Sequence, residues 1–255
     1  MKLNQAQIRI NLSIMAINKE VLKTRALTAV VFVAVMLVGL FYNEWSFIIL
    51  FTIIHFGGWY EFIKLMKKIN GNKYLPYCLL GIIYITMPLL MLYHLGVTIS
   101  ASHINLDSID LANPYRVSVG FSALLPAAVI FSIWINDTMA YIVGSLIGKT
   151  PFSKISPKKT WEGTAGGAIL CVIVIGLLGY FIPVAKQIAV QHWFAIAAIC
   201  AIFGTAGDLL ESKIKRMADV KDSGSFMPGH GGFLDRFDSL LVATPFVWLY
   251  VQLFL

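Results

Sequence analysis

Apolar segments of membrane-crossing length constrain the fold of this chain more than any other feature. A helix needs ~20 consecutive apolar residues to cross the hydrocarbon core of a bilayer. Segments that approach this length recur at residues 26–41, 46–63, 75–95, 117–135, 166–182, 192–207 and 240–255. The chain is 58% hydrophobic and only 13% charged, whereas a soluble domain carries about 25% charged residues. The sequence therefore predicts an all-α, polytopic integral membrane protein with about seven transmembrane helices.

Two places leave the helix pattern open. The apolar run at residues 139–147 is too short to cross a bilayer alone. It extends the preceding helix, re-enters the membrane or forms a separate helix, so the expected number of spans ranges from about seven to about nine. Pro88 lies inside the third segment and predicts a kink, which membrane helices tolerate.

The positive charges of the chain, whose net charge is +7, are concentrated in four segments. Of its 20 Lys and Arg residues, 18 lie in residues 1–25, 64–73, 148–163 and 207–238. Cytoplasmic loops of membrane proteins carry an excess of Lys and Arg. We therefore expect the N-terminus and the polar loops on the cytoplasmic side of the cytoplasmic (inner) membrane. This orientation requires an odd number of crossings between Arg116 and Lys149.

Three parts follow from this organisation. Residues 1–24 form an N-terminal cytoplasmic or interfacial segment, either an amphipathic surface helix or a frayed end. Residues 25–117 hold the N-terminal membrane helices and an outer loop. Residues 118–255 hold the polar clusters described below, and we expect them to form a catalytic membrane domain.

The stretch at residues 207–238 contains an unusual density of charge for so apolar a chain. Six of the 13 acidic residues lie in it, namely Asp208, Glu211, Asp219, Asp222, Asp235 and Asp238. Bases and glycines are interspersed among these carboxylates. Such a mixture beside membrane helices suggests metal-assisted chemistry on a phosphate group.

Three carboxylates of this stretch are candidate metal ligands. Asp208 ends an apolar helix, where a carboxylate is costly and usually faces a cavity or a partner. Asp235 and Asp238 are three residues apart and share one face at a predicted helix start. Together they suit Mg²⁺, which prefers oxygen ligands; a second cation is left open. The Glu211–Lys215 pair, by contrast, is expected to be a solvated ion pair within one helix.

Candidate phosphate-binding groups lie beside these carboxylates. The glycine-flanked His230 precedes the predicted helix start, where backbone N–H groups can turn toward an anion. Lys221 and Arg236 can hold phosphates, Arg in bidentate fashion. In the basic loop 148–163, Lys158 and Lys159 bind polyphosphate or a lipid headgroup, or else act only as a positive-inside anchor. Asp137 ends the fourth segment, where a carboxylate suggests a partner, a metal or a sugar hydroxyl.

Two pairs of glycines have the spacing that lets membrane helices approach closely, Gly144 with Gly148 and Gly163 with Gly167. Such spacing is common by chance in apolar sequence. A homodimer is suggested by it and by nothing else in the chain.

The residues from Ser212 to Asp238 strongly resemble the signature of the phosphatidate cytidylyltransferases (CDP-diacylglycerol synthases). The matching positions are Ser212, Ile214, Lys215, Arg216, Lys221, Asp222, Gly224, Pro228, His230, Gly231, Gly232, Phe233, Asp235, Arg236, Phe237 and Asp238. One departure is Met227, where the family usually has Ile, Leu or Phe. The resemblance covers about residues 136–238, and the first part of the chain shares only hydropathy with the family.

The resemblance implies that CTP and phosphatidate give CDP-diacylglycerol and pyrophosphate, with Mg²⁺ as cofactor. It implies a catalytic set of Asp208, Lys221, Asp222, Asp235, Arg236 and Asp238, with metal binding by Asp208, Asp235 and Asp238. It implies a substrate-binding set of Asp137, Lys158, Lys159, Ser212, Lys215, Arg216, His230, Gly231 and Gly232. No nucleic acid is expected as a partner.

Three other functions stay open at this point. A CTP-dependent polyprenol or phytol kinase also has polar cytoplasmic loops, but it releases CDP instead of pyrophosphate. A transporter would use intramembrane carboxylates for coupling ions and would show two related halves with broken helices. A lipid-binding scaffold without catalysis would not need the full acidic set.

Overall fold

The computed structural model describes residues 23–24, 26–102, 121–226 and 231–255. Most of these residues are helical, and no strand occurs among them. The helices are Ala26–Phe41, α2 (Glu44–Asn70), α3 (Leu75–Cys78), α4 (Met87–Ser102), α5 (Leu124–Ile147), α6 (Trp161–Phe181), α7 (Val190–Met217) and α8 (Leu234–Phe254). Short 3-10 turns cover Gly71–Lys73 and Pro183–Gln187.

Helices long and apolar enough to cross a membrane make up most of the described chain. There are six of them, Glu44–Lys73, Leu75–Val97, Leu124–Ile147, Trp161–Phe181, Val190–Met217 and Leu234–Phe254, and the shorter apolar helix Ala26–Phe41 accompanies them. Large apolar side chains such as Ile53, Phe56 and Tyr60 are exposed on the outside, where lipid would surround them. The prediction of an all-α, polytopic membrane protein is confirmed.

The two open places in the helix pattern have simple structural answers. Residues 139–147 are the last part of α5, so they add no separate crossing. The third span contains a π-helical segment, Ile82–Thr86, directly before α4. Pro88 has no N–H to donate to the carbonyl four residues earlier. One residue earlier, the Met87 N–H bonds to the Ile82 carbonyl, five residues back, so the helix is widened over Ile82–Thr86, just before Pro88, as in a π-bulge.

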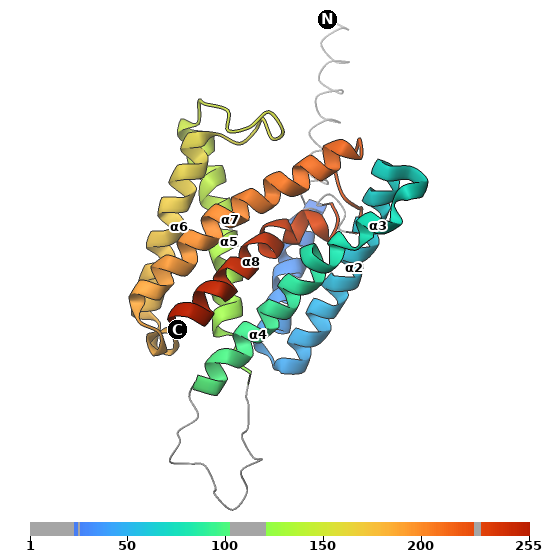
Figure 1. Ribbon diagram of the computed structural model, residues 1–255. Coiled ribbons are helices and arrows are strands. Elements are labelled where there is room, and N and C mark those ends of the chain that lie inside the picture. Colours follow the sequence, from blue (N-terminus) through green and yellow to red (C-terminus); the bar gives the residue numbers. More distant parts are fainter. Residues whose placement is uncertain (1–22, 25, 103–120, 227–230) are drawn as a thin grey trace, which may run out of the picture.

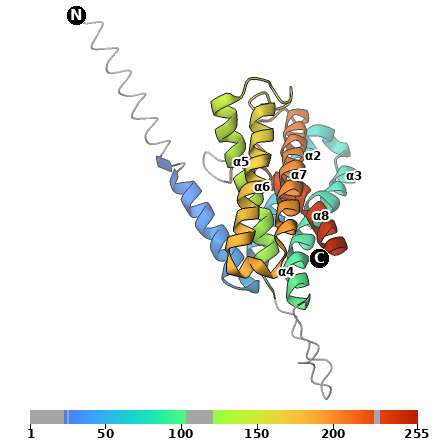
Figure 2. The ribbon, with the colours of Figure 1, turned by 90° about the vertical axis from the view of Figure 1, so that its left-hand side faces the viewer.

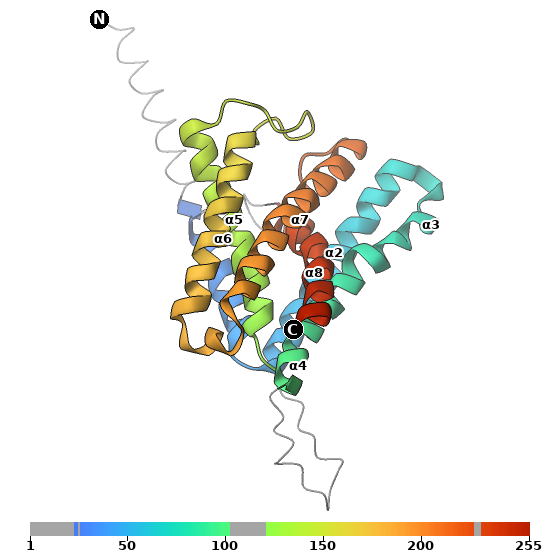
Figure 3. The ribbon, with the colours of Figure 1, turned by 60° about the vertical axis from the view of Figure 1, so that its left-hand side comes forward.

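Helices α7 and α8 form the centre of the arrangement. They pack against each other, while α6 packs against α7, α4 against α8, and α5 against both α6 and α7. Figure 3 shows α7 and α8 between the α5–α6 pair and the α2–α3 segment, and Figure 2 shows α5, α6 and α7 side by side. The helices of the C-terminal half, α5 to α8, are therefore packed together, with α7 and α8 at the centre.

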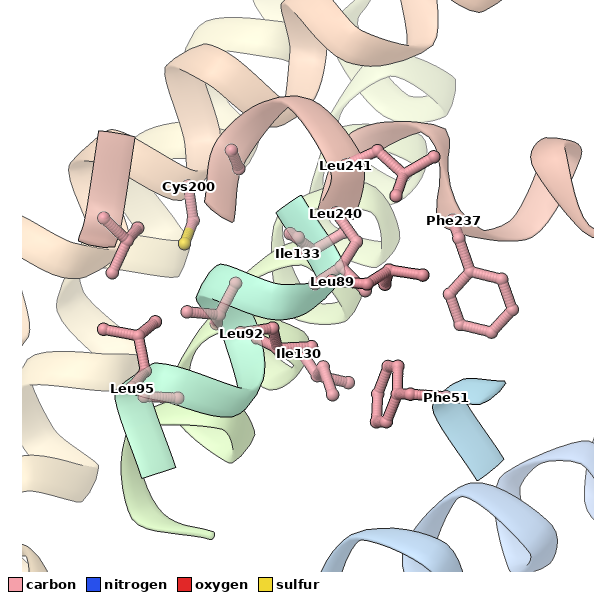
Figure 4. Packing of buried hydrophobic residues seen from close by; sticks show 14 of the residues in the cluster. Phe51, Leu89, Leu92, Leu95, Ile130, Ile133, Cys200, Phe237, Leu240 and Leu241 are labelled. Atoms are coloured by element: carbon pink, nitrogen blue, oxygen red, sulfur yellow. The ribbon is translucent and has the colours of Figure 1, made fainter. Parts of the chain in front are cut away.

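The core joins α4 to the C-terminal helices. Figure 4 shows Leu89 and Leu92 of α4 near Ile130 of α5 and Leu240 of α8. These side chains belong to one cluster of buried apolar residues. Fully burying one such side chain contributes about 1.5–3 kcal/mol relative to leaving it exposed to water. In lipid the same contacts act mainly through close packing.

The glycine pairs serve packing within the chain. A Cβ atom on Gly163 would lie 2.8 Å from the Gly144 Cα, and one on Gly167 would lie 2.7 Å from the Ala140 Cα. Such separations are too short for any side chain, so glycine lets the backbones of α5 and α6 touch. The spacing that suggested a homodimer is thus explained by the α5–α6 contact.

Three of the four basic segments lie together in the described part of the chain. Figure 1 shows the α2–α3 turn, the α5–α6 loop and the C-terminal end of α7 at one end of the bundle, with the α6–α7 connection at the other. This arrangement agrees with the expectation that the polar loops share one side of the membrane.

Candidate active site

A cavity of about 460 Å³ opens where α5, α6, α7, α8 and the basic loop meet. Its polar lining comprises Asn136, Asp137, Tyr141, Ser145, Ser156, Lys158, Lys159, Thr160, Thr164, Thr205, Asp208, Asp235, Asp238 and Ser239. Three clusters that are separate in the sequence therefore share one cavity: the end of the fourth apolar segment, the basic loop and the acidic stretch.

Carboxylates crowd this cavity. A Cβ atom on Gly207 would lie 2.5 Å from the Asp238 carbonyl oxygen, so α7 and α8 meet closely enough to bring Asp208 beside Asp238. Asp238 is only 7% exposed, and the negative charges of Asp208 and Asp137 act on it. Like charges in a poorly solvated cavity repel one another strongly, so cations are favoured here.

The basic loop delivers two lysines to the same cavity. Pro151 and Thr160 form an antiparallel bridge, and the Phe152 N–H donates to the Lys159 carbonyl at 2.8 Å. The Thr160 hydroxyl then accepts the Gly163 N–H at 3.1 Å and caps α6. This short hairpin directs the Lys159 ammonium to Asp208, with which it forms an ion pair.

Glu162 closes the basic loop from the first turn of α6. Its carboxylate accepts the Thr150 hydroxyl at 2.8 Å and the Lys149 N–H at 3.2 Å. The beginning of the loop is thereby tied to its end. Sequence reasoning assigned Glu162 no role, because a Glu in the first turn of a helix is an ordinary stabilising residue.

A buried ion pair network lies behind the cavity. The Lys215 ammonium is 2.6 Å from Asp235 Oδ1 and also pairs with Glu211. Glu211 is 1% exposed, so the expectation of a solvated Glu211–Lys215 pair is wrong about solvation, although the ion pair itself is present. The reason is that α8 covers this face of α7, and packing between distant helices is invisible in a helix-local pattern.

Asp235 is fully engaged by the protein. Its Oδ2 atom accepts the Ser223 N–H at 2.9 Å, the Gly232 N–H at 2.7 Å and contacts the Ser223 hydroxyl at 2.9 Å. Within the described residues, no three Asp, Glu, His or Cys side chains are grouped to hold one metal ion. The expected ligand trio of Asp208, Asp235 and Asp238 is therefore not assembled around a common point.

The remaining predicted site residues lie outside the cavity lining or outside the described chain. Among the described residues, Lys221, Asp222, Arg216 and Arg236 are exposed and Ser212 is partly buried, and none of these five lines the cavity.

Several of the other predicted residues shape the backbone around the site. Arg216 donates to the Val220 carbonyl at 3.0 Å and closes the end of α7. Gly231 has a φ of 84°, and a Cβ atom there would lie 2.5 Å from Asp235 Oδ2. Gly232 donates its N–H to the same carboxylate. His230 falls outside the described residues.

Glu61 is the main residue that sequence reasoning missed. It lies on α2, is 3% exposed, and accepts hydrogen bonds from the backbone N–H groups of Phe233 and Leu234. A single carboxylate within an apolar run was the available signal, because such groups are usually functional. Asn136, also buried, lines the cavity beside Asp137.

Comparison with known proteins gives a consistent result. A sequence model of the Cytidylyltransferase family matches residues 111–254, more than half of the chain. The Phosphatidate cytidylyltransferase of Bacillus subtilis is 42% identical over 125 residues, which are 48% of this chain and 45% of that protein. The Staphylococcus saprophyticus protein of the same name is 46% identical over 114 residues, 44% of this chain and 43% of that protein.

A plant protein shows the same likeness. The chloroplastic Phosphatidate cytidylyltransferase 4 of Arabidopsis thaliana is 42% identical over 118 residues, 46% of this chain and 29% of that protein. The matched segments thus span less than half the length of these curated relatives.

Proposed function

The chain belongs to the cytidylyltransferase family, and we propose that it transfers the cytidylyl group of CTP to phosphatidate, giving CDP-diacylglycerol and pyrophosphate. The observation that carries the proposal is the cavity in which Lys158 and Lys159 face Asp137, Asp208 and Asp238. All of these residues lie inside the matched range 111–254. Relatives that bear the name phosphatidate cytidylyltransferase add support.

The cavity suits the chemistry of this transfer. A phosphate oxygen of phosphatidate attacks the α-phosphorus of CTP, the bond from that phosphorus to the β-bridging oxygen breaks, and pyrophosphate leaves with the electron pair. The attacking oxygen is already anionic, so little base catalysis is needed. The main difficulty is the approach of two anions, which positioning and preorganised positive charge overcome. Lys158 and Lys159 supply such charge.

Mg²⁺ is the cofactor that the donor set fits. The cavity offers carboxylate oxygens, the ligands that Mg²⁺ prefers, and the ion commonly takes one or two carboxylates together with substrate phosphates. Asp208 and Asp238 would hold it, with Asp137 as an outer ligand. When bound, the ion would neutralise negative charge on the phosphates. Asp235 is proposed instead as a support for the segment that begins α8, because its oxygens are occupied.

Of the signature residues outside the cavity, Lys221 and Arg236 are proposed as triphosphate contacts, Arg216 as a substrate-binding residue and Asp222 as a polar support or outer metal ligand. Lys221, Asp222, Arg216 and Arg236 are supported by the resemblance to the family signature and not by the cavity lining.

The protein is a membrane protein, and we propose the inner membrane with the cavity open to the cytoplasm, where CTP is available. The gathering of basic segments at one end of the bundle supports this orientation. The homodimer stays a prediction, to be checked by mass measurement in detergent. The proposed cavity does not need a second copy, because its lining comes from one chain.

Release of pyrophosphate by the detergent-purified protein tests the proposal. Phosphatidate, CTP and Mg²⁺ are supplied together and then omitted one at a time. We expect pyrophosphate only when all three are present. CDP formed with a polyprenol or phytol, without pyrophosphate, would replace the proposal by the kinase function. Neither product from a folded sample would reject both.

A further inference from the structure

We propose that Glu61 is a positioning residue that holds Ser223, Gly224 and the start of α8 in the arrangement required for the transfer, an inference that rests on the proposed function. Glu61 belongs to α2 and lies outside the matched range 111–254. It would make the N-terminal membrane helices part of the functional unit, although they share only hydropathy with the family.

Glu61 caps α8 from another helix. The first N–H groups of any helix lack partners within it, and the N-cap residue of α8, Phe233, has no side-chain cap hydrogen bond. Glu61 Oε1 accepts the Phe233 N–H at 2.9 Å, and Oε2 accepts the Leu234 N–H at 3.0 Å. A carboxylate at this end of a helix also interacts favourably with the helix dipole.

Glycines make room for this carboxylate. A Cβ atom on Gly224 or on Gly232 would overlap the Glu61 oxygens. Both glycines belong to the signature segment, so the backbone at these two positions lies directly against Glu61. At Gly57, one turn earlier on α2, a Cβ atom would overlap the Phe233 ring. The start of α8 therefore packs closely against α2 at two places, at Gly57 and at Glu61.

The position of Glu61 itself is set by packing. Its neighbour Phe62 is 2% exposed and Leu65 is 1% exposed, so this part of α2 is anchored in the core. A side chain held in this way can impose its position on the segment that it contacts.

A short chain of contacts links Glu61 to the cavity. The Ser223 hydroxyl lies 2.7 Å from Glu61 Oε2 and 2.9 Å from Asp235 Oδ2. Asp235 in turn binds Lys215. Asp238 follows Asp235 by one helical turn on α8. A shift at Glu61 would therefore displace the first turn of α8, and with it Asp238 in the cavity.

Replacement of Glu61 by the isosteric Gln tests the inference. The amide has one acceptor oxygen, so either the Phe233 or the Leu234 N–H loses its partner. Because misplacing groups by about 1 Å costs about 100-fold in rate, we expect Glu61→Gln to lose about 100-fold in turnover. Glu61→Asp keeps the carboxylate and should recover part of that loss. The matched control is Glu44→Gln on the same helix, where Glu44 accepts the Tyr93 hydroxyl and turnover should be unchanged.

Hydrogen exchange supplies a readout that does not depend on turnover. Amides of a peptide that contains Phe233 and Leu234 should exchange faster in Glu61→Gln than in the wild type or in Glu44→Gln, while peptides from α6 keep their rates. Unchanged exchange at Phe233 and Leu234 overturns the inference whether or not the protein turns over CTP.

The two proposals fail differently. If the wild type releases no pyrophosphate, the proposed function fails, and the exchange result still decides whether Glu61 holds the segment. If the wild type is active and folded Glu61→Gln equals it, or if Glu61→Asp is no better than Glu61→Gln, the positioning role is overturned. If Glu61→Gln does not fold, Glu61→Asp decides. Its shorter side chain should reach the Phe233 and Leu234 N–H groups less well, so turnover should fall and these amides should exchange faster than in the wild type. Reduced turnover without faster exchange at these amides would reject the role.

Discussion

Charged residues from three helices and one loop line the cavity of the candidate site, and the contacts between them decide what each residue can do. Lys159 pairs with Asp208, while Asp238 is buried and the negative charges of Asp208 and Asp137 act on it. Asp235 is not available as a metal ligand because its carboxylate oxygens already bind the Lys215 ammonium and the Ser223 and Gly232 N–H groups.

Asp238→Asn should reduce pyrophosphate release by about 100-fold or more, because preorganised charged groups in such sites contribute about 10²–10³ in rate. Initial rates at saturating CTP and phosphatidate measure the effect. Asp219→Asn is the matched control. Asp219 is exposed just beyond α7 and has a φ of 51°, a conformation that Asn adopts readily. Equal rates for the two variants would contradict the assignment of Asp238.

Lys159→Gln should lower kcat/KM by about 10-fold to 100-fold, the range expected when a hydrogen bond to a charged group worth about 1.5–3 kcal/mol is lost. The loop offers Lys154→Gln as its control, because Lys154 is exposed and does not line the cavity. Titrating each substrate separately shows whether the KM for CTP or for phosphatidate rises. A Lys154→Gln variant as impaired as Lys159→Gln would mean that the loop acts only through its overall charge.

At the scale of elements, close backbone contacts position the site. Helices α5 and α6 touch at glycines, and α7 meets α8 at Gly207. Helix α7 continues without a break from the apolar segment to Met217. It therefore carries Asp208, Glu211 and Lys215 on a single rigid element, and α8 covers the face on which Glu211 lies.

Gly167→Ala should destabilise the protein, because the added Cβ would lie 2.7 Å from backbone atoms of Ala140, which cannot move aside. Overpacking of this kind costs about 1–3 kcal/mol. Gly58→Ala is the control, since its Cβ would meet side-chain atoms at 3.6 Å, an ordinary contact distance. Thermal unfolding in detergent should show a lower Tm for Gly167→Ala only. Equal Tm values would mean that α5 and α6 can separate without cost.

At the scale of the whole molecule, the α5–α6 loop, whose lysines line the cavity, lies at one end of the bundle with the α2–α3 turn and the C-terminal end of α7. All three cysteines, Cys78, Cys171 and Cys200, are buried. Cysteines introduced at exposed loop positions would therefore be the reactive ones, so labelling can determine the orientation.

Lys186→Cys should react with a membrane-impermeant maleimide in intact cells, and Lys154→Cys should react only after the membrane is opened. Both side chains are exposed, but they lie in connections at opposite ends of the bundle (Figure 1). The positive-inside rule places the basic loop in the cytoplasm. The reverse labelling pattern would invert the orientation and place the cavity away from cytoplasmic CTP.

Much of the candidate site could be predicted from local sequence. A carboxylate at the end of an apolar helix is costly wherever the helix goes, which singled out Asp137 and Asp208, and the lysines of the basic loop stand out by charge alone. Glu61 and Glu162 were missed because their importance lies in what they contact. Glu61 reaches Leu234 across 173 positions of sequence, a pairing that no local pattern encodes.

The sequence by itself determined that this chain is a helical membrane protein, and it carries the signature of its family, because hydropathy and motif are properties of neighbouring residues. Only the tertiary structure decided which residues meet. It joined residues 139–147 to α5, buried the Glu211–Lys215 pair, engaged Asp235 and brought α2 to the start of α8. The physical reason is that helix formation is satisfied by bonds within a segment, whereas the choice of neighbours depends on close packing between surfaces far apart in the chain.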